Sequence, residues 1–273
     1  MAEKVLPITS ERSLISADRL REQYQDGTNL NARFQLHRRF STNRYGLFRW
    51  IFDRFNLPQH ARILELGSGT AMLWRSNAGR IPTGWRTVLS DFSAGMIREG
   101  RSNLTGFRNS MMFAQLDAQA LPFSDRVFDA VIANHVLYHV PEIPTALREI
   151  RRVLLPSGKL FAAAFGRANM KEFDDALVRL ISPGAASSSA TRFGLETGRD
   201  LMSEVFSSVE ILKYSDSLVV TEVQPLMDYV ESTGLRSAQS DRKAALRNFF
   251  EAELLRNGAI HITKDTGLLI GSA

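Results

Sequence analysis

The segment Arg62–Ala71, with the sequence RILELGSGTA, constrains the fold of this chain more than any other. Ile63 to Leu66 is a short apolar run that is typical of a buried strand, and Gly67 and Gly69 follow it directly. Glycine lets the backbone turn sharply and approach a ligand closely, because no β-carbon is in the way. We therefore expect a strand, a glycine turn and a helix that begins near Thr70, an arrangement that can hold a nucleotide-like ligand.

The glycine pattern also narrows the kind of ligand. The fingerprint that binds a pyrophosphate has three glycines, and the third place here is not glycine. This departure argues against a nicotinamide oxidoreductase and favours a ligand that has an adenosine but no phosphate. A Gly-x-Gly pair by itself also occurs in ordinary strand-to-helix turns, so the prediction of a ligand site depends on the segments that follow.

A second short strand, Arg86–Asp91, ends in a carboxylate about 25 residues after Glu65, which is the distance that one helix and a return strand require. An acid at this place can accept hydrogen bonds from both ribose hydroxyls of a nucleoside. The alternative is that Asp91 caps the helix that starts at Ser93, since aspartate is a good capping residue. Both roles can hold together.

Two more strands are expected, over Ser110–Leu116 and Phe128–Ala133. In open α/β sheets, ligands bind at the carboxyl ends of the strands, so Asp117 and Asn134 would line the same crevice as Gly67 and Asp91. Asp117 could meet an adenine amino group, or it could simply form the turn.

Five segments of this chain resemble, in the same order, the class I S-adenosylmethionine-dependent methyltransferases, in particular the small-molecule type similar to the ubiquinone and menaquinone enzymes. Together they extend from about Arg62 to Phe165, and as an ordered set they are specific. The chain departs from the pattern at Ala71, where many members carry a third glycine; alanine also allows close helix packing. The segments are residues 63–70, 89–96, 115–123, 128–140 and 147–160.

The resemblance implies a Rossmann-like α/β fold: a seven-stranded, mostly parallel sheet with helices on both faces and one antiparallel edge strand. The expected organisation is an N-terminal helical cover over 1–58, a cofactor-binding core over 59–166, a helical insertion with a mobile loop over 167–208, and C-terminal strands and helices over 209–273 that complete the sheet. The last segment is expected to end in a strand pair, 259–263 and 267–270.

The resemblance also implies S-adenosyl-L-methionine as the cofactor. Arg33, in the helical cover, would pair with the methionine carboxylate, and Tyr24 would close the methyl pocket as a catalytic residue. Each has an ordinary alternative as a surface or core-edge residue. The expected cofactor-binding residues are Glu65, Gly67, Ser68, Gly69, Asp91, Phe92, Met96, Asp117, Ala118, Asn134 and Arg33.

His135 and His139 lie four residues apart, a spacing that puts two side chains on one face if the segment is helical. Such a pair can bind a metal ion, but the metalloprotease pattern needs a glutamate after the first histidine, and Val136 stands there with no third ligand evident. We expect no metal. In resembling enzymes this segment borders the reacting methyl group, so either histidine could act as a base, while simple packing is the alternative for each.

Basic residues exceed acidic ones by 34 to 29, and arginines between residues 33 and 54 alternate with aromatic side chains. Such a pattern can bind RNA, which makes an RNA methyltransferase the alternative function. The apolar residues recur at helical spacing, however, which favours a core-facing stripe with the arginines on a solvated face. We therefore expect a small-molecule substrate and no nucleic acid.

The chain has no cysteine, which excludes disulfides and thiolate chemistry. No stretch approaches the roughly 20 apolar residues of a membrane span, and the amino terminus has no signal pattern, so we expect a cytoplasmic protein without a membrane segment. The expected reaction is methyl transfer to an oxygen, nitrogen or carbon of a small molecule, plausibly a secondary metabolite. A protein of this fold that binds the cofactor without turnover is the remaining alternative.

Overall fold

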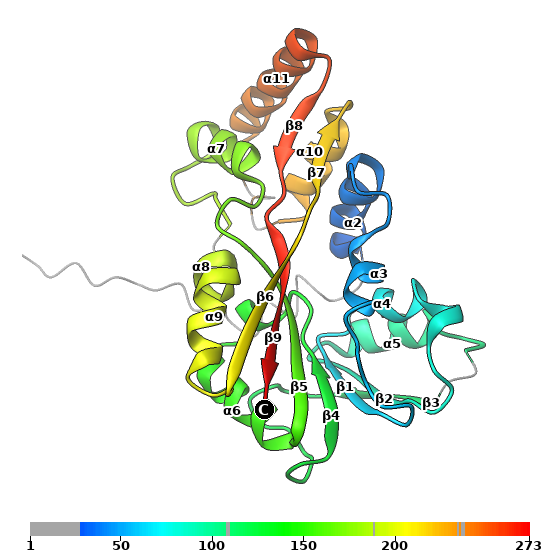
Figure 1. Ribbon diagram of the computed structural model, residues 1–273. Coiled ribbons are helices and arrows are strands. Elements are labelled where there is room, and N and C mark those ends of the chain that lie inside the picture. The colour runs from blue at the N-terminus through cyan, green and yellow to red at the C-terminus, as the bar shows by residue number, and fades with distance from the viewer. Residues whose placement is uncertain (1–27, 108–109, 188, 234, 236–237) are drawn as a thin grey trace, which may run out of the picture.

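The computed structural model describes residues 28–107, 110–187, 189–233, 235 and 238–273. Its main element is a seven-stranded sheet in the order β3-β2-β1-β4-β5-β9-β6 (Figure 1), which confirms the expected Rossmann-like α/β fold. The strands of this sheet are β1 (Arg62–Leu66), β2 (Arg86–Asp91), β3 (Ser110–Gln115), β4 (Phe128–Ile132), β5 (Leu154–Phe165), β6 (Ser208–Tyr214) and β9 (Thr266–Ser272).

Strands β1 to β5 run parallel to one another, and β9 runs antiparallel to both β5 and β6. The antiparallel strand therefore does not lie at the edge, as the sequence led us to expect, but one place inside it. The reason is that β9 returns from an excursion that begins after β6, and it pairs with β6 on one side and with β5 on the other.

Successive side chains of the central strands point to opposite faces of the sheet, and both faces are covered. Leu64 of β1 packs in a core with Leu147 of α6 and Met202 of α9. Ile63, one residue earlier, packs on the other face with Ile51 of α3 and Leu73 of α4. The helices of this part are α3 (Leu47–Phe52), α4 (Met72–Arg75), η1 (Ala78–Arg80), α5 (Ala94–Asn103), η2 (Leu137–His139), α6 (Ile143–Val153), α8 (Ser189–Phe193) and α9 (Leu195–Ser203).

A second lobe stands above the carboxyl ends of the sheet strands (Figure 1). Strands β7 and β8 form a separate antiparallel pair, and the helices around them share one hydrophobic core that includes Leu36, Phe173, Leu226 and Phe250. The lobe consists of α2 (Thr28–Phe40), α7 (Lys171–Leu180), β7 (Ser217–Val220), α10 (Gln224–Glu231), α11 (Ser240–Asn257) and β8 (Ile260–Thr263).

This lobe changes the expected organisation of the C-terminal segment. Only β6 and β9 of residues 209–273 join the large sheet, and β8 and β9 do not pair with each other. The reason is that β7 and β8 bury their apolar side chains, such as Leu218 and Ile262, against α2 and α11 instead. The N-terminal helix α2 and the C-terminal segment therefore build one structure together.

Candidate active site

The carboxyl ends of β1, β2, β3 and β4 open into a cavity of about 1070 Å³ that continues between the sheet and the second lobe. Its lining includes Gly67, Asp91, Asp117 and Asn134, each at the end of one of these strands or within two residues beyond it, so the crevice expected from the sequence is confirmed. Ligand pockets commonly measure roughly 300–1,000 Å³, so this one has room for a cofactor and an acceptor side by side.

The turn after β1 depends on its glycines. Gly67 and Gly69 have φ angles of 64° and 52°, in the left-handed region that glycine adopts without strain. A β-carbon on Gly67 would also lie 2.4 Å from Cγ2 of Val136. Ala71 has a φ of 60° as well, in the region that favours glycine over alanine.

Glu65 is almost completely buried at the end of β1, with 2% of its surface exposed. Its Oε2 accepts a hydrogen bond from Nε1 of Trp74 at 2.6 Å, and its Oε1 accepts one from Nδ2 of Asn134 at 3.4 Å. Burial raises the pKa of Glu65 to about 7, although these two donors act in the opposite direction. The carboxyl can therefore gain or lose its proton near neutral pH.

Asp91 ends β2 and holds the turn together. Its Oδ2 accepts a hydrogen bond from the Gly69 amide at 3.0 Å, and its Oδ1 accepts one from the Ser93 amide at 2.8 Å. The cap of α5 itself is Ser93, whose hydroxyl accepts from the Met96 amide. Burial raises the pKa of Asp91 despite these donors. Phe92 and Met96 line the cavity beside this carboxylate.

Asp117 and Ala118 also line the cavity. The Asp117 carboxylate folds back on its own turn, where Oδ1 accepts hydrogen bonds from the amide of Gln119 at 2.9 Å and from its Nε2 at 3.0 Å. Arg33 lies on the opposite wall, and its Nε donates to Oγ of Ser232 at 3.1 Å, which connects α2 to the end of α10. The cofactor contacts expected of Asp117 and Arg33 stay predictions.

His135 and His139 both line the cavity, but they do not share a helical face. The helical turn η2 covers only Leu137–His139, and His135 precedes it with a φ of 53°. The segment is not one helix, because the His135 amide donates to the Ala163 carbonyl of β5 at 2.9 Å, which extends the sheet pairing past the end of β4. The His135 ring stacks on Phe165 with centroids 4.3 Å apart.

The electrostatic setting of the two histidines is unusual for proton acceptors. Burial lowers the pKa of His135 to about 3 and that of His139 to about 4, and Lys264 and Arg33 respectively act in the same direction. Both rings are therefore neutral at physiological pH. Arg192 of α8 donates to the carbonyl of Tyr138 at 2.9 Å and so fixes η2 from outside the cavity.

Tyr24 lies outside the described residues. Sequence reasoning also missed several residues that line the cavity between the lobes, among them His37 of α2 and the ion pair of Asp216 with Lys264. Lone charged residues at breaks between strands carry little signal in a sequence, because such positions are usually solvated turns.

The described residues contain no group of three or more histidine, aspartate or glutamate side chains placed to hold a metal ion. Among the same residues, no helix has the length and apolar character that crossing a membrane requires.

Comparison with known proteins places residues 64–162 in the family described as methyltransferase domain. The ubiquinone/menaquinone biosynthesis C-methyltransferase UbiE of Hahella chejuensis is 33% identical over 121 residues, which are 44% of this chain and 49% of that protein. A second UbiE, from Pectobacterium carotovorum, is 31% identical over 135 residues, or 47% of this chain and 53% of that protein. The chain thus spans about half the length of these curated relatives.

Solved structures share the fold more widely. The YcgJ protein of Bacillus subtilis superposes with a TM-score of 0.59 at 18% identity, over 82% of this chain and 97% of that chain. Phosphoethanolamine N-methyltransferase 2 of Haemonchus contortus, solved in complex with S-adenosyl-L-methionine, gives a TM-score of 0.57 at 17% identity, over 93% of this chain and 59% of that chain.

Proposed function

Because residues 64–162 form a class I S-adenosylmethionine-dependent methyltransferase domain, we propose that this protein transfers a methyl group from S-adenosyl-L-methionine to an oxygen, nitrogen or carbon atom of a small molecule. The observation that carries the proposal is the single cavity at the carboxyl ends of β1 to β4, which holds the glycine turn and the Asp91 carboxylate at one end and continues toward the second lobe. A site for two ligands is what a transfer reaction requires.

The residues at the carboxyl ends of the strands fit the cofactor. Oγ of Ser68 and Oδ1 of Asn134 are buried in this region and have no hydrogen-bond partner within the described part of the chain. Buried polar atoms cost free energy unless a partner satisfies them, and a polar ligand can supply that partner. Asp91 would accept hydrogen bonds from ribose hydroxyls, while Gly67 and Gly69 let the backbone lie close to the ligand.

When bound, S-adenosyl-L-methionine supplies a methyl group on a positively charged sulfur, which makes that carbon electrophilic. The chain's own contribution is to orient the acceptor and to keep water out, since alignment at near-attack distance can provide much of the rate. An acceptor that carries a proton, such as a phenol, also needs a base. His135 and His139 line the cavity in their neutral forms, so each can accept a proton in principle.

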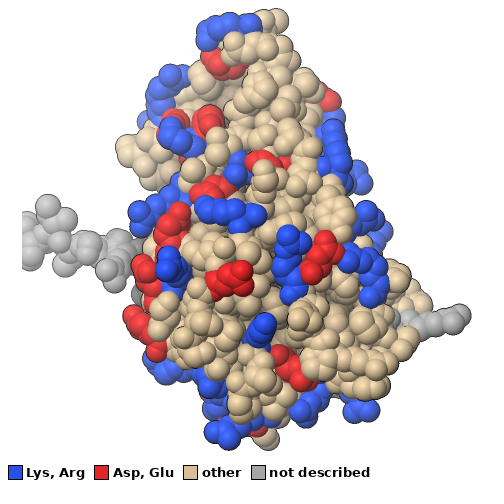
Figure 2. Space-filling model, viewed as in Figure 1, with Lys and Arg blue, Asp and Glu red and all other residues tan. Residues whose placement is uncertain are grey.

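The RNA alternative receives no support from the related proteins found. Figure 2 shows acidic side chains interspersed among the basic ones on the visible face. Arg39 forms an ion pair with Glu222, and Arg54 lies over the Trp50 ring, which agrees with a solvated helix face. A small substrate displaces few counterions, so we expect apparent substrate affinity to change little with salt, whereas RNA binding would weaken steeply. A cytoplasmic location also stays a proposal.

The test starts with the purified full chain. Mass spectrometry detects co-purified S-adenosylmethionine or its demethylated product, and calorimetry with S-adenosylhomocysteine gives the affinity. A screen of phenols, amines and indoles for transfer of a labelled methyl group then identifies the acceptor atom. Binding of the cofactor without transfer to any class of acceptor would favour a non-catalytic protein of the same fold, and lack of cofactor binding would contradict the proposal.

A further inference from the structure

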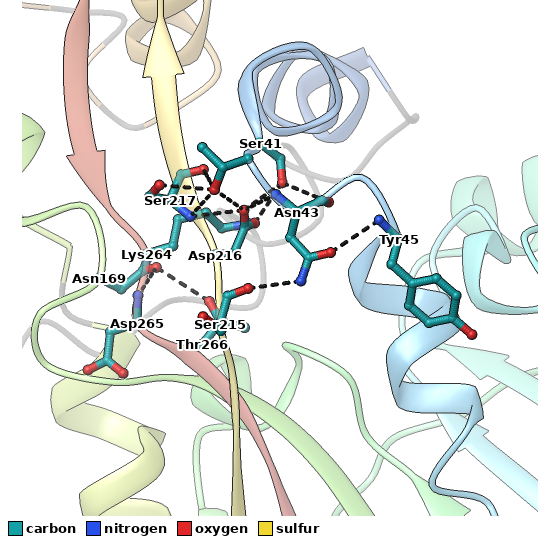
Figure 3. Close-up of polar contacts among 11 residues, drawn as sticks. Ser41, Asn43, Tyr45, Asn169, Ser215, Asp216, Ser217, Lys264, Asp265 and Thr266 are labelled. Atoms are coloured by element: carbon teal, nitrogen blue, oxygen red, sulfur yellow. Dashed lines mark hydrogen bonds and ion pairs between the residues drawn. The ribbon is translucent and has the colours of Figure 1, made fainter.

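An ion pair lies in the wall of the cavity where the chain passes between the two lobes (Figure 3). Nζ of Lys264 is 2.6 Å from Oδ2 of Asp216, and the exposed fractions of the two side chains are 7% and 1%. Asp216 precedes β7, and Lys264 follows β8, so the pair stands at the junction of the large sheet and the second lobe. Moving charged side chains out of water costs free energy, and the contacts of this buried ion pair have to offset that cost.

The carboxylate of Asp216 is surrounded by donors from the protein. It accepts hydrogen bonds from Oγ of Ser41 at 2.7 Å and from the amides of Asn43 and Ser217, each at 2.9 Å. Burial would raise the pKa of Asp216, but Lys264 and the other donors together hold it below its ordinary value. Asp216 is therefore a fixed negative charge that also anchors the linker between α2 and α3.

Among the described residues, the ammonium group of Lys264 has fewer hydrogen-bond partners than the carboxylate of Asp216. An ammonium group has three N–H donors, and within the described part of the chain Asp216 is the hydrogen-bond acceptor that Nζ contacts. Nζ also lies over the face of the Tyr214 ring, 5.9 Å from the ring centroid. Donors are therefore left for a ligand in the cavity that Lys264 lines.

Besides Asp216, two histidine rings lie within electrostatic reach of Lys264, and both are uncharged. Burial, followed by the charge of Lys264, lowers the pKa of both His37 and His135 to about 3, so neither ring competes as a cation. The Nδ1 atoms of these two histidines are buried without a hydrogen-bond partner among the described residues. Phe165, which stacks on His135, and Phe173 line the same space.

We infer that Lys264 is a specificity-determining residue that binds a carboxylate group on an aromatic methyl acceptor. The aromatic side chains would pack on the flat ring of the acceptor, and the ammonium would donate to its oxygen. Asp216 holds the ammonium in place from behind. This inference rests on the proposed methyltransferase function, and it adds the class of acceptor.

The test compares matched acids and amides that differ only in charge. Calorimetry in saturating S-adenosylhomocysteine measures the binding of 4-hydroxybenzoate against 4-hydroxybenzamide, and of 1-hydroxy-2-naphthoate against its amide. We expect the wild type to prefer each acid by about tenfold or more, since a hydrogen bond to a charged group is worth roughly 1.5–3 kcal/mol. K264R should keep most of this preference, and K264M should lose it.

K264M leaves the buried Asp216 without its counterion and can lose stability for that reason alone. The double variant K264M/D216N removes both charges together and keeps the approximate shape of the pair. K213M is the matched control, because Lys213 forms an ion pair with Asp265 at the same junction but does not line the cavity. Circular dichroism establishes that each variant is folded before binding is measured.

If the ion pair of Lys264 with Asp216 only joined the two lobes, its removal would change the thermal stability of the variants but not the ratio of acid to amide affinity. Loss of the ratio in K264M/D216N with the ratio kept in K213M supports the inference. Equal affinity for acids and amides in the wild type, no measurable binding of either member of both pairs, or an unchanged preference in K264M/D216N overturns it. S-adenosylhomocysteine affinity is measured separately, so a failure of cofactor binding, which concerns the proposed function, is distinguishable from a failure of anion recognition.

Discussion

Trp74 donates a hydrogen bond from its indole Nε1 to the buried carboxyl of Glu65, 2.6 Å away, at the point where β1 enters the glycine turn. The bond joins the strand end to α4 and fixes the orientation of a carboxyl whose pKa burial raises to about 7. A group that is half ionised near neutrality responds strongly to any charge that arrives beside it.

Cofactor binding should release a proton through Glu65. The amino group of the ligand carries a positive charge that favours the ionised carboxylate, so binding near pH 7 should expel part of a proton. Calorimetry with S-adenosylhomocysteine in two buffers of different ionisation enthalpy measures this release, and E65Q should abolish it. W74F removes a donor that favours the ionised form, so the release should move to higher pH. Equal heats in both buffers for the wild type would contradict the assignment.

Gly67→Ala should destabilise the protein and weaken cofactor binding, because the added β-carbon meets Val136 at 2.4 Å and the φ of 64° is strained for alanine. Gly258→Ala is the control, since Gly258 has a φ of 73° with nothing within 4 Å of an added β-carbon. The control should lose about 1 kcal/mol and Gly67→Ala more than that. Adding Val136→Ala to Gly67→Ala should recover part of the lost free energy of unfolding, which chemical denaturation measures. Equal losses in all variants would refute the steric explanation.

Asp91→Ala should lower the affinity for S-adenosylhomocysteine by about 2 to 4 kcal/mol, the sum of two hydrogen bonds to a charged acceptor. The variant also removes the acceptor of the Gly69 and Ser93 amides, so Asp91→Asn, which keeps the shape, separates the charge from the turn. Asp125→Ala serves as the control, because Asp125 pairs with Arg152 away from the cavity. Unchanged affinity in a folded Asp91→Ala protein would remove Asp91 from the ribose site.

Three histidines should each contribute a loss of stability as the pH falls from about 6.5 toward 4. His37, His135 and His139 have lowered pKa values of about 3, 3 and 4, while histidine in an unfolded chain takes up its proton near 6.5. Between these values each of these histidines binds more protons in the unfolded state, so its contribution to the free energy of unfolding decreases with decreasing pH, whereas Glu65 with its raised pKa acts in the opposite direction. Denaturation at several pH values should show a shallower dependence for His135→Asn than for the exposed His261→Asn. Equal slopes in the two variants would contradict this.

Turnover of a phenolic acceptor should not rise through the ordinary histidine pKa near 6.5, because His135 and His139 are already neutral there. If one of them is the base, its alanine variant should lose about 10²- to 10⁴-fold in turnover with cofactor affinity nearly unchanged. Rate profiles between pH 5.5 and 8.5, compared for His135→Ala and His139→Ala, provide the test. Near-normal turnover in both variants would leave positioning, with Tyr24 as one candidate, as the source of the rate.

The binding edge of the sheet could be predicted from the sequence because its signals are local. A buried strand, a glycine pair and a terminal carboxylate each lie within a few residues, and parallel strands bring their carboxyl ends together. This reasoning placed Gly67, Asp91, Asp117 and Asn134 on one cavity correctly. It left open whether His135 and His139 lie on one helix, because the bond from His135 to Ala163 of β5 is a contact between distant segments.

The sequence by itself therefore determined the fold class, the family of the core and the part of the site at the carboxyl ends of β1 to β4. Tertiary structure alone decided the part of the cavity next to the second lobe, where Ser41 and Asp216 meet across 175 residues of chain and Lys264 forms an ion pair with Asp216. Side chains that far apart have no shared periodicity or spacing, and their meeting depends on how β7 and β8 pack against α2. The physical reason is that the carboxyl ends of the parallel strands follow from hydrogen bonding within consecutive strand-helix units, whereas the part next to the second lobe follows from the packing of two lobes that the chain crosses several times.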